Sequence, residues 1–419
     1  MATLSKAILR SYHPTVIGIT GSVGKTSTKE AIALVLAEDH RVRASSKNYN
    51  NEIGVPLTIL GTRSPGRSIF GWVGTFLRGL LLLLFRSRAY PEILVLEMAA
   101  DHKGDIAYLT ELAPCHIGVL TGISHAHTEF LGTVDDVAQE KSAIITHLGV
   151  SDIAILNADD QRVLALREQT QARVITFGFS ENADVYAHTL SLTKPDGDTF
   201  FALQGTIAYG NNTAQFRVSC LVGQHQLLAP LAAVAVAIAT DVPFVAAVKR
   251  IQGYKVPDGR MRQLAGIKHT LLLDDTYNSS PAAADAALAT LAQVPASGRK
   301  IAVLADMAEL GSYSDEDHRS IGEIVQELGI DILITVGPQS KKTAQTAVEH
   351  GMAKDHVFSF DDAMTAAKFL QERIEQGDVV LLKGSQVFRM EKAVKEVMAD
   401  PERAGELLVR QDPTWLVRS

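Results

Sequence analysis

The sequence predicts an α/β protein built from two successive units, each with a parallel sheet covered by helices. Short runs of β-branched and aliphatic residues alternate with longer amphipathic segments, a pattern typical of parallel sheets. The alternation stops at a stretch rich in Gly, Pro and charged residues and then restarts. The length of 419 residues also favours more than one core.

The first unit is expected to cover residues 1–252. The run "TVIGIT" (15–20) predicts a buried strand, which a Gly-rich turn joins to a helix over about 25–38. The runs "EILVLEMA", "HIGVLTGI" and "IAILNADD" predict further strands, each ending at a polar cluster. Period-two runs between 185 and 222 predict a small antiparallel annex, and an Ala-rich helix follows at 229–240.

The stretch "QGYKVPDGRMRQ" predicts a hinge linker at 253–263, and the second unit is expected to cover 264–419. Its strands are expected in "HTLLLDDTYN", "KIAVLADM", "DILITVG", "HVFSF" and "DVVLLKGS". Ligands of such sheets bind beyond the carboxyl ends of the strands, where the polar clusters lie. The sequence therefore predicts a site in the cleft between the two units.

Composition excludes several classes of function. A net charge of −7 and a pI near 6.0 argue against a general nucleic-acid binder. Cys115 and Cys220 are far apart and lack CxxC spacing, so neither a disulfide framework nor a zinc site is expected. The first twenty residues lack a signal-peptide core, and a cytoplasmic location is expected.

The motif "GITGSVGKTST" follows a strand and opens a helix, the context in which Gly-Lys-Thr indicates phosphate binding. Backbone N–H groups at the helix N-terminus would receive phosphates, Lys25 would add a positive charge, and the Thr26 hydroxyl could ligate Mg²⁺. Ile19 occupies the first Gly position of the strict pattern. The motif still predicts an ATP-type site, whose residues are Gly21, Ser22, Val23, Gly24, Lys25, Thr26 and Ser27.

Polar residues at the next strand ends could complete a metal site. Glu97 ends one strand, and His125 and His127 end the next. A carboxylate and an imidazole at neighbouring strand ends can share a metal ion with bound phosphates. Taken alone, each of these residues is more often structural than metal-binding, and Lys141 alone would be interpreted as a solvated helix lysine.

An ordered set of motifs carries a family resemblance. The segments "TGSVGKTSTKE", "NYNNEIGVP", "LEMAADHKGDI", "SHAHTEFLGT", "EKSAI", "NADD", "VPDGRM", "LLLDDTYNSSP", "LADMAELG" and "LLKGS" occur in this order. Together they resemble the Mur ligase family, most of all its members that add D-Ala-D-Ala to a UDP-linked muramoyl tripeptide. The likeness runs from about residue 14 to 395 and accounts for the P-loop mismatch, because TGxxGKT is the family's form of the loop.

The resemblance implies a P-loop central domain, a C-terminal Rossmann-like domain, and ATP-dependent amide formation through an acyl phosphate. It implies that Thr26 and Glu97 hold one Mg²⁺, and that His127 and carbamylated Lys141 hold a second. Lys25, His127 and Lys141 are thus the expected catalytic residues. The residues expected to contact the nucleotide beyond the P-loop are Asn51, Arg260, Asp275, Tyr277 and Asn278. Lys383 matches a position for which a substrate-side role is expected.

The sequence departs from the family pattern at several positions. Gln226 and Ala229 stand where amides near the adenine are expected, which puts the adenine contact in doubt. Ala99 and Ala305 each replace a family glycine. The P-loop also begins at residue 18, so the resemblance predicts a chain without the N-terminal domain that grips UDP.

Three functions follow from these observations. The first is a carboxylate–amine ligase that adds D-Ala-D-Ala or a similar amine to a cell-wall peptide precursor. The second is a Mur-type ligase acting on a γ-glutamyl chain or a cofactor carboxylate. The third is a catalytically silent nucleotide-binding scaffold at the membrane. Expected partners are small-molecule peptide or amino-acid substrates and no nucleic acid.

The stretch "SIFGWVGTFLRGLLLLLFRSR" (68–88) interrupts the family pattern as an apolar insertion at about 62–91. Residues 69–85 form about 26 Å of helix, which is short for a bilayer span. Five arginines and no acidic residue between 62 and 90 suit an interfacial helix on an anionic membrane surface. A packing or dimer contact is the alternative. The working hypothesis is that the insertion recruits a lipid-linked substrate or replaces missing binding surface.

Overall fold

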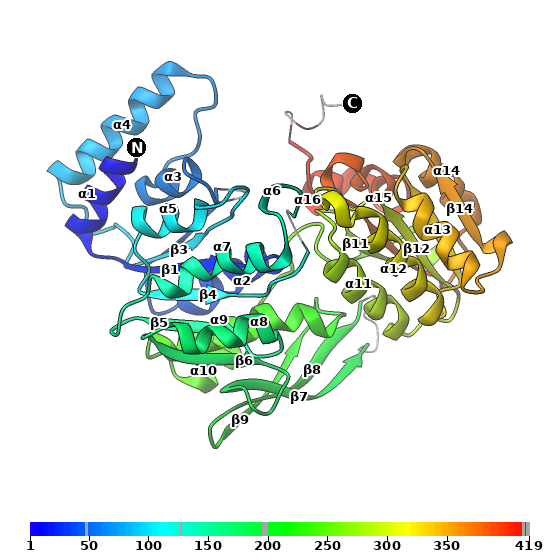
Figure 1. The fold of residues 1–419 in the computed structure, drawn as a ribbon, viewed down its shortest axis with the longest axis horizontal. Coiled ribbons are helices and arrows are strands. Elements are labelled where there is room, and N and C mark those ends of the chain that lie inside the picture. Colours follow the sequence, from blue (N-terminus) through cyan, green and yellow to red (C-terminus); the bar gives the residue numbers. More distant parts are fainter. Residues whose placement is uncertain (47–48, 126–127, 195–199, 413–414, 416–419) are drawn as a thin grey trace.

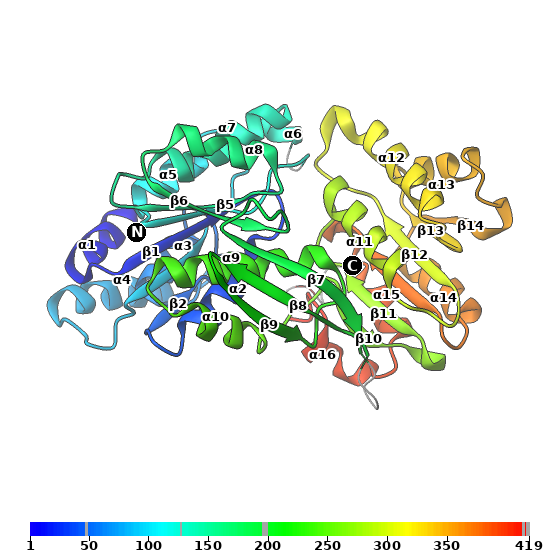
Figure 2. The same ribbon diagram turned by 90° about the horizontal axis from the view of Figure 1, so that it is seen from below.

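The computed structural model describes residues 1–46, 49–125, 128–194, 200–412 and 415. It contains a nine-stranded sheet in the order β2-β3-β1-β4-β5-β6-β7-β8-β9 and a six-stranded sheet in the order β10-β11-β15-β12-β13-β14. The two sheets lie side by side along the longest axis of the molecule (Figures 1 and 2). The predicted α/β class with two sheets is confirmed, whereas the exact domain boundaries stay a prediction.

The strands agree with the hydrophobic runs of the sequence. Those of the first sheet are β1 (Thr15–Thr20), β2 (Val42–Ala44), β3 (Ile93–Glu97), β4 (Ile117–Leu120), β5 (Ile153–Asn157), β6 (Arg173–Gly178), β7 (Val185–Thr193), β8 (Ala202–Tyr209) and β9 (Asn212–Val218). Those of the second are β10 (Arg262–Ala265), β11 (Leu271–Asp275), β12 (Lys300–Ala305), β13 (Ile332–Val336), β14 (Val357–Phe360) and β15 (Val379–Lys383).

The α-helices cover both sheets. Those of the first part of the chain are α1 (Ala2–Tyr12), α2 (Lys25–Leu36), α3 (Gly54–Leu60), α4 (Ile69–Leu84), α5 (Asp105–Leu112), α6 (Thr128–Leu131), α7 (Val134–Thr146), α8 (Gln161–Leu164), α9 (Leu228–Ala239) and α10 (Phe244–Ile251). Those of the second part are α11 (Pro281–Gln293), α12 (Ser314–Glu327), α13 (Ser340–Glu349), α14 (Ala363–Arg373), α15 (Glu391–Val397) and α16 (Ala404–Leu407).

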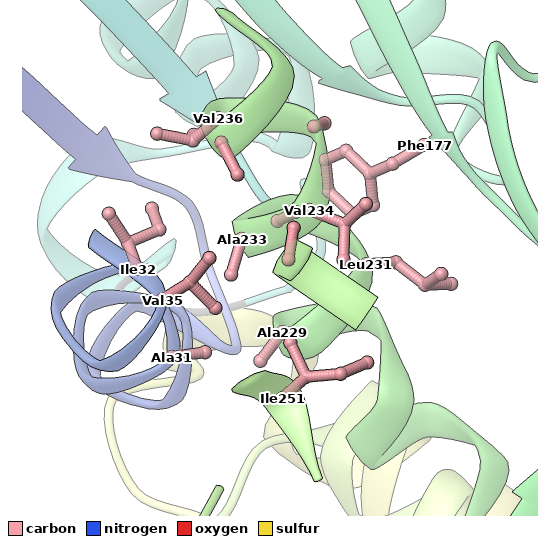
Figure 3. Packing of buried hydrophobic residues seen from close by; sticks show 14 of the residues in the cluster. Ala31, Ile32, Val35, Phe177, Ala229, Leu231, Ala233, Val234, Val236 and Ile251 are labelled. Atoms are coloured by element: carbon pink, nitrogen blue, oxygen red, sulfur yellow. The ribbon is translucent and has the colours of Figure 1, made fainter. Parts of the chain in front are cut away.

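The P-loop helix α2 is held by an apolar layer on one face of the large sheet. Its residues Ala31, Ile32 and Val35 are fully buried in one cluster with the side chains of the Ala-rich helix α9. Figure 3 shows these α2 side chains pointing toward Ala233 and Val236 of α9. Because small alanines let the two helices approach closely, the start of α2 is fixed relative to the strand ends that form the site.

The predicted antiparallel annex is confirmed. β7, β8 and β9 pair antiparallel and extend the parallel part of the first sheet, with β6 and β7 still parallel. The annex also binds the second sheet directly. Phe201 donates its N–H to Gln263 Oε1 at 2.9 Å, and Gln263 Nε2 donates to the Phe201 carbonyl at 2.9 Å. Gln263 lies in β10, so the annex is fastened to the first strand of the second sheet.

Two helices form the opposite end of the first sheet. α1 and α4 pack together, and Figures 1 and 2 place them at the far end of the long axis from the second sheet. Tyr12 donates its hydroxyl to the Leu82 carbonyl at 2.7 Å, and Gly79 lies directly against Leu4. Across the described ranges, no helix is long and apolar enough to cross a membrane.

Candidate functional site

A cavity with a volume of about 440 Å³ lies between the two sheets. One wall is the P-loop with the carboxyl ends of β3 and β4, and the other is the carboxyl ends of β11 and β15. The volume falls within the ordinary range for small-molecule sites. The predicted position of the site, beyond the strand ends between two units, agrees with this cavity.

The P-loop is shaped by two glycines and braced by the end of β4. Gly21 and Gly24 have φ values of 150° and 83°, and a Cβ on Gly21 would lie 2.0 Å from Thr121 Oγ1. Ser22 donates its N–H to the Gly122 carbonyl at 2.8 Å, while Thr121 Oγ1 donates to the Val23 carbonyl at 2.5 Å. The loop therefore has a fixed curvature around the N-terminus of α2.

Lys25 begins α2 and folds over the loop. Its Nζ donates to the Gly21 carbonyl at 2.6 Å. Burial lowers the pKa of its ammonium, while the nearby Glu97 carboxylate opposes that shift. A bound phosphate would offer this ammonium a stronger acceptor than the loop carbonyl.

Glu97 ends β3 with a buried carboxylate. Asn50 Nδ2 donates to its Oε1 at 3.2 Å, whereas Oε2 has no hydrogen bond and lies 3.9 Å from Lys29 Nζ. Glu97 and Lys29 are 3% and 1% exposed. A buried carboxylate oxygen without a hydrogen bond, facing a phosphate loop, has the chemistry of a Mg²⁺ ligand.

Lys141 lies on α7 and is 1% exposed. Burial, followed by repulsion from Lys25, lowers its pKa to about 7. Its neighbour Glu140 points to α5 and accepts the N–H groups of Gly104 and Ile106 at 2.6 and 2.8 Å. The lowered pKa favours the neutral amine, the form that can react with CO₂ to give a carbamate.

The second wall brings three predicted residues together. Lys383 Nζ donates to Asp275 Oδ2 at 2.6 Å and to the Asn278 carbonyl at 3.0 Å. These side chains line the cavity opposite the P-loop. The pair supplies one positive and one negative group to the same side of the cleft.

Arg260 connects the two walls. Its guanidinium donates to Thr26 Oγ1 at 3.2 Å and lies 4.2 Å from the centre of the Tyr277 ring. Thr26 belongs to α2 and Tyr277 follows β11, so a residue between the two units touches both. The arrangement places the Arg260 guanidinium beside the phosphate loop, in addition to the Lys25 ammonium.

A second contact between the units lies at the edge of the cleft. His125 Nδ1 is 3.2 Å from Asp317 Oδ1 of α12, and its ring lies 4.8 Å from that of Tyr313. Thr128 Oγ1 donates to the Leu310 carbonyl at 3.1 Å. His125, one of the two histidines considered at this strand end, therefore contacts the second unit.

Most of the residues expected from the sequence line the cavity. These are Ser22, Val23, Gly24, Lys25, Thr26, Ser27, Glu97, Arg260, Asp275, Tyr277 and Asn278. Gly21 and Lys141 do not line it, because Gly21 forms the back of the loop and Lys141 is buried in α7. His127 lies outside the described residues.

Asn51, expected to contact the nucleotide, does not line the cavity. It is exposed, and its Oδ1 accepts the N–H groups of Ile53 and Gly54 at the start of α3, so its nucleotide contact stays a prediction. Asn50 lines the cavity instead and holds Glu97. The physical reason is the course of the loop, in which adjacent side chains point in different directions.

Sequence reasoning missed several polar residues of the cavity. Asp101 lines it and acts electrostatically on both Lys25 and Lys141. His225 also lines it, and burial lowers the pKa of its imidazole to about 4. Both lie in segments that the family resemblance covers, Asp101 in "LEMAADHKGDI" and His225 in "GQHQLLA".

Gln226, which stands where the family pattern has an amide near the adenine, is held by hydrogen bonds on both sides of its amide. Its Oε1 accepts the N–H groups of Val222 and Gly223 at 2.9 Å each. Its Nε2 donates to the carbonyls of Arg260 and Met261 at 3.4 and 3.3 Å. The amide therefore lines the cavity while it holds the arginine-bearing linker in place.

The side chains of the site suit phosphate binding and supply only part of the ligands that a metal ion needs. Within the part of the chain that the structure describes, no three His, Cys, Asp or Glu side chains gather closely enough to hold a metal ion alone. Thr26 and Glu97 offer two oxygen donors beside the P-loop. Mg²⁺ usually takes one or two protein ligands and completes its shell with water and substrate phosphates, so these residues fit it.

Profiles of two known domains match the chain. The Mur ligase middle domain matches residues 19–70 and 77–237, and the Mur ligase glutamate ligase domain matches residues 259–386. The first match leaves out only residues 71–76 of the segment that was expected to be an insertion.

Similar proteins with known names agree with these matches. UDP-N-acetylmuramoyl-tripeptide–D-alanyl-D-alanine ligase of Bacillus subtilis is 29% identical over 95% of this chain and 79% of its own length. The enzyme of the same name from Mycobacterium bovis is 32% identical over 96% of this chain and 76% of its own length.

Solved structures give the same result for the fold. MurF of Acinetobacter baumannii has a TM-score of 0.78 and 25% identity, covering 94% of this chain and 78% of that one. MurF ligase of Thermotoga maritima in complex with ADP has a TM-score of 0.77 and 28% identity, covering 97% and 83%.

Proposed function

The chain belongs to the Mur ligase family, and on that premise we propose that it is an ATP-dependent ligase joining a carboxylate to an amine. Its proposed substrates are a peptidoglycan peptide precursor and D-alanyl-D-alanine, the pair in the names of the similar enzymes. The observation that carries the proposal is the cavity between the sheets, which puts a P-loop opposite the Lys383–Asp275 pair.

The reaction runs in two steps. The substrate carboxylate attacks the γ-phosphorus of ATP, so that an acyl phosphate forms and ADP leaves. The amine then attacks the acyl carbon, the C–N bond forms, and inorganic phosphate and a proton are released. Both steps gather negative charge on phosphoryl oxygens, which makes electrostatic stabilisation and positioning the main tasks of the protein.

The residues of this chain divide those tasks. The P-loop backbone and Lys25 bind the phosphates, and Arg260 adds positive charge from the linker. Tyr277 and Asn278 line the cavity on the side opposite the loop, where they would enclose the nucleotide. Lys383, held by Asp275, is placed to bind the substrate carboxylate or the acyl phosphate.

We assign two Mg²⁺ sites to the same cleft. Thr26 and Glu97 would hold the first ion, and His127 with carbamylated Lys141 would hold the second. The ions supply neutralisation of phosphate charge. The buried, unbonded oxygen of Glu97 supports the first assignment, and the lowered pKa of Lys141 supports the second.

The test is a ligation assay with mass detection. Purified protein with ATP, Mg²⁺, UDP-muramoyl tripeptide and D-alanyl-D-alanine should release ADP and phosphate. It should also form a product with the summed mass of the two substrates less one water. Glu97→Gln keeps the shape of the side chain and its bond from Asn50 but removes the charge, so it should lower turnover by about a hundredfold or more. Glu111→Gln, at an exposed position of α5, is the matched control and should retain wild-type turnover.

Other outcomes would replace the proposal. Turnover with a γ-glutamyl acceptor and glutamate, but not with D-alanyl-D-alanine, would identify a Mur-type ligase with another substrate. Nucleotide binding without ADP formation for every carboxylate and amine tried would identify a scaffold. Equal turnover of Glu97→Gln and wild type would remove Glu97 from the metal site.

A further inference from the structure

Helix α4 exposes an unusually apolar face. Its large side chains recur at helical spacing and lie on one side, among them Ile69, which is 77% exposed, Phe70 at 89%, Leu77 at 54%, Leu80 at 50% and Leu84 at 73%. Val73, Phe76, Leu81 and Phe85 are exposed beside them. Isolated exposed leucines are common on proteins, but a contiguous face of nine large apolar side chains marks an interaction site.

The opposite face of α4 is packed on the protein. Thr75 and Gly79 are buried, and Leu82 and Leu83 pack against the core beneath the helix. Arg78 donates its Nε to the Leu60 carbonyl at 3.1 Å, at the end of α3. The helix is thus a fixed part of the fold, and its apolar side faces outward because the opposite side is packed on the core.

Positive charge surrounds the apolar face. Residues 62–91 contain five arginines and no acidic residue, and α1 beside them adds Lys6 and Arg10, again without an acidic residue. This is opposite in sign to the chain as a whole, whose net charge is −7. The exposed Arg63 and Arg67 precede the helix, and the exposed Arg86 and Arg88 follow it, so cations border both ends of the apolar face.

From this geometry we infer that α4 docks on the surface of a bilayer containing anionic lipids. The helix lies in the interface with its apolar side among the upper acyl chains and its flanking arginines among the phosphates. A second copy of the chain is the less suitable occupant, because two such faces would bring their arginine borders together without acidic partners. The 16 residues of α4 suit lying on the membrane, not crossing it.

The position of α4 leaves the cleft accessible. Figures 1 and 2 place α1 and α4 at one end of the long axis and the second sheet at the other. No residue of either helix lines the cavity. The hypothesis that this segment supplies substrate-binding surface stays a prediction, and the inference of membrane docking does not depend on the proposed ligase chemistry.

Vesicle flotation of the full chain tests the inference. Vesicles of phosphatidylcholine with phosphatidylglycerol should carry wild-type protein to the top of the gradient, whereas phosphatidylcholine alone should not. The variant Phe70→Gln/Leu77→Gln/Leu84→Gln should partition about a hundredfold more weakly, and so should Arg63→Gln/Arg67→Gln/Arg86→Gln/Arg88→Gln. The matched controls Val150→Gln/Val245→Gln and Arg167→Gln/Arg217→Gln change exposed positions outside α1, α4 and their flanks, and should float like wild type.

Both α4 variants should keep the wild-type circular dichroism spectrum and ATP turnover in the absence of vesicles, because the changed side chains are exposed and outside the cavity. Binding to neutral vesicles that ignores the arginines would overturn the anionic-surface inference. So would the absence of vesicle binding, whether or not sedimentation velocity finds a dimer that the apolar-face variant abolishes.

Discussion

The two ends of the first sheet both depart from the usual pattern of buried apolar and exposed charged residues, one by burying charges and the other by exposing apolar side chains. At the carboxyl ends of its strands, charged side chains are buried: Lys29 and Lys141 are 1% exposed and Glu97 is 3% exposed. At the other end, beside α1, apolar side chains are exposed, up to 89% for Phe70. Each arrangement is costly for a protein that only has to fold.

The difference shows how each cost is offset. Buried charges at the cleft are placed among opposite charges and oxygen donors, so they can act on a ligand that enters. Exposed apolar side chains have no such partner within the chain, so their partner must come from outside it. Substitutions at the cleft should therefore change turnover, whereas substitutions on the exposed face of α4 should leave turnover and stability unchanged.

The largest effect is expected at the buried amine. Lys141→Ala removes the proposed metal-binding lysine and should lower ADP formation by about a thousandfold, or about 4 kcal/mol in transition-state stabilisation. Lys103→Ala is the control, because its ammonium is exposed and pairs with Asp136 at 2.7 Å outside the cavity. Steady-state turnover of the two variants decides the point; undiminished turnover of Lys141→Ala would refute the two-ion arrangement.

The inner and outer sides of α4 should differ in stability. A Cβ on Gly79 would lie 2.3 Å from Leu4 and 3.2 Å from Leu60, whereas one on Gly74 would meet nothing within 4 Å. Gly79→Val should lower the free energy of unfolding by about 2 kcal/mol, and Gly74→Val should change it by less than about 0.5 kcal/mol. Urea titrations measure both; equal values would mean that α4 is not packed as described.

A pH dependence is expected from Asp274 in the second sheet. The residue is fully buried, and burial raises its pKa from 3.8 to about 7. Between these values the folded state holds a proton that the unfolded state has lost, so the contribution of this residue to stability falls as the pH rises from about 4 to 7. Asp274→Asn removes the titration and should be more stable than wild type by up to about 4 kcal/mol at pH 8, with little difference at pH 4.

Urea unfolding at the two pH values checks this expectation. The exposed Asp285→Asn on α11 is the control and should give no pH-dependent difference. A gain from Asp274→Asn that is the same at both pH values would show that the ionised carboxylate is not the cause.

The smallest effect is expected on the outer side of α4. Leu80 is 50% exposed, so Leu80→Gln should alter the free energy of unfolding by less than about 0.5 kcal/mol. Leu82→Gln, two positions further along the same helix, faces the core and should cost about 1–2 kcal/mol. Comparable losses for the two variants would mean that the outer face is covered within the chain.

Much of the fold could be predicted because local sequence determines it. The runs expected as strands in both units lie in β1, β3, β4, β5 and β11 to β15, since each is a short apolar stretch that ends at a polar cluster. The P-loop could be predicted for the same reason. Its glycines, Lys25 and Thr26 are adjacent in the chain, and the strand and helix around them are local too.

The rest of the site depends on contacts that the sequence does not specify. His125 and Asp317 are 192 positions apart and meet only because the two sheets dock. Lys29 has the appearance of a solvated helix lysine, yet α2 turns it toward Glu97. The adjacent Asn50 and Asn51 have different partners, Glu97 and the start of α3, and the sequence does not determine which of the two amides turns to the cleft.

The pair of hydrogen bonds between Phe201 and Gln263 has a mechanical consequence. It fixes one point of the second sheet to the annex, and the chain itself enters that sheet at the neighbouring Arg262. A swing of the second sheet about an axis through this point would leave the Phe201–Gln263 pair intact. The same swing would separate His125 from Asp317 and Thr128 from Leu310, because these contacts lie away from β10 in the sequence and in the fold.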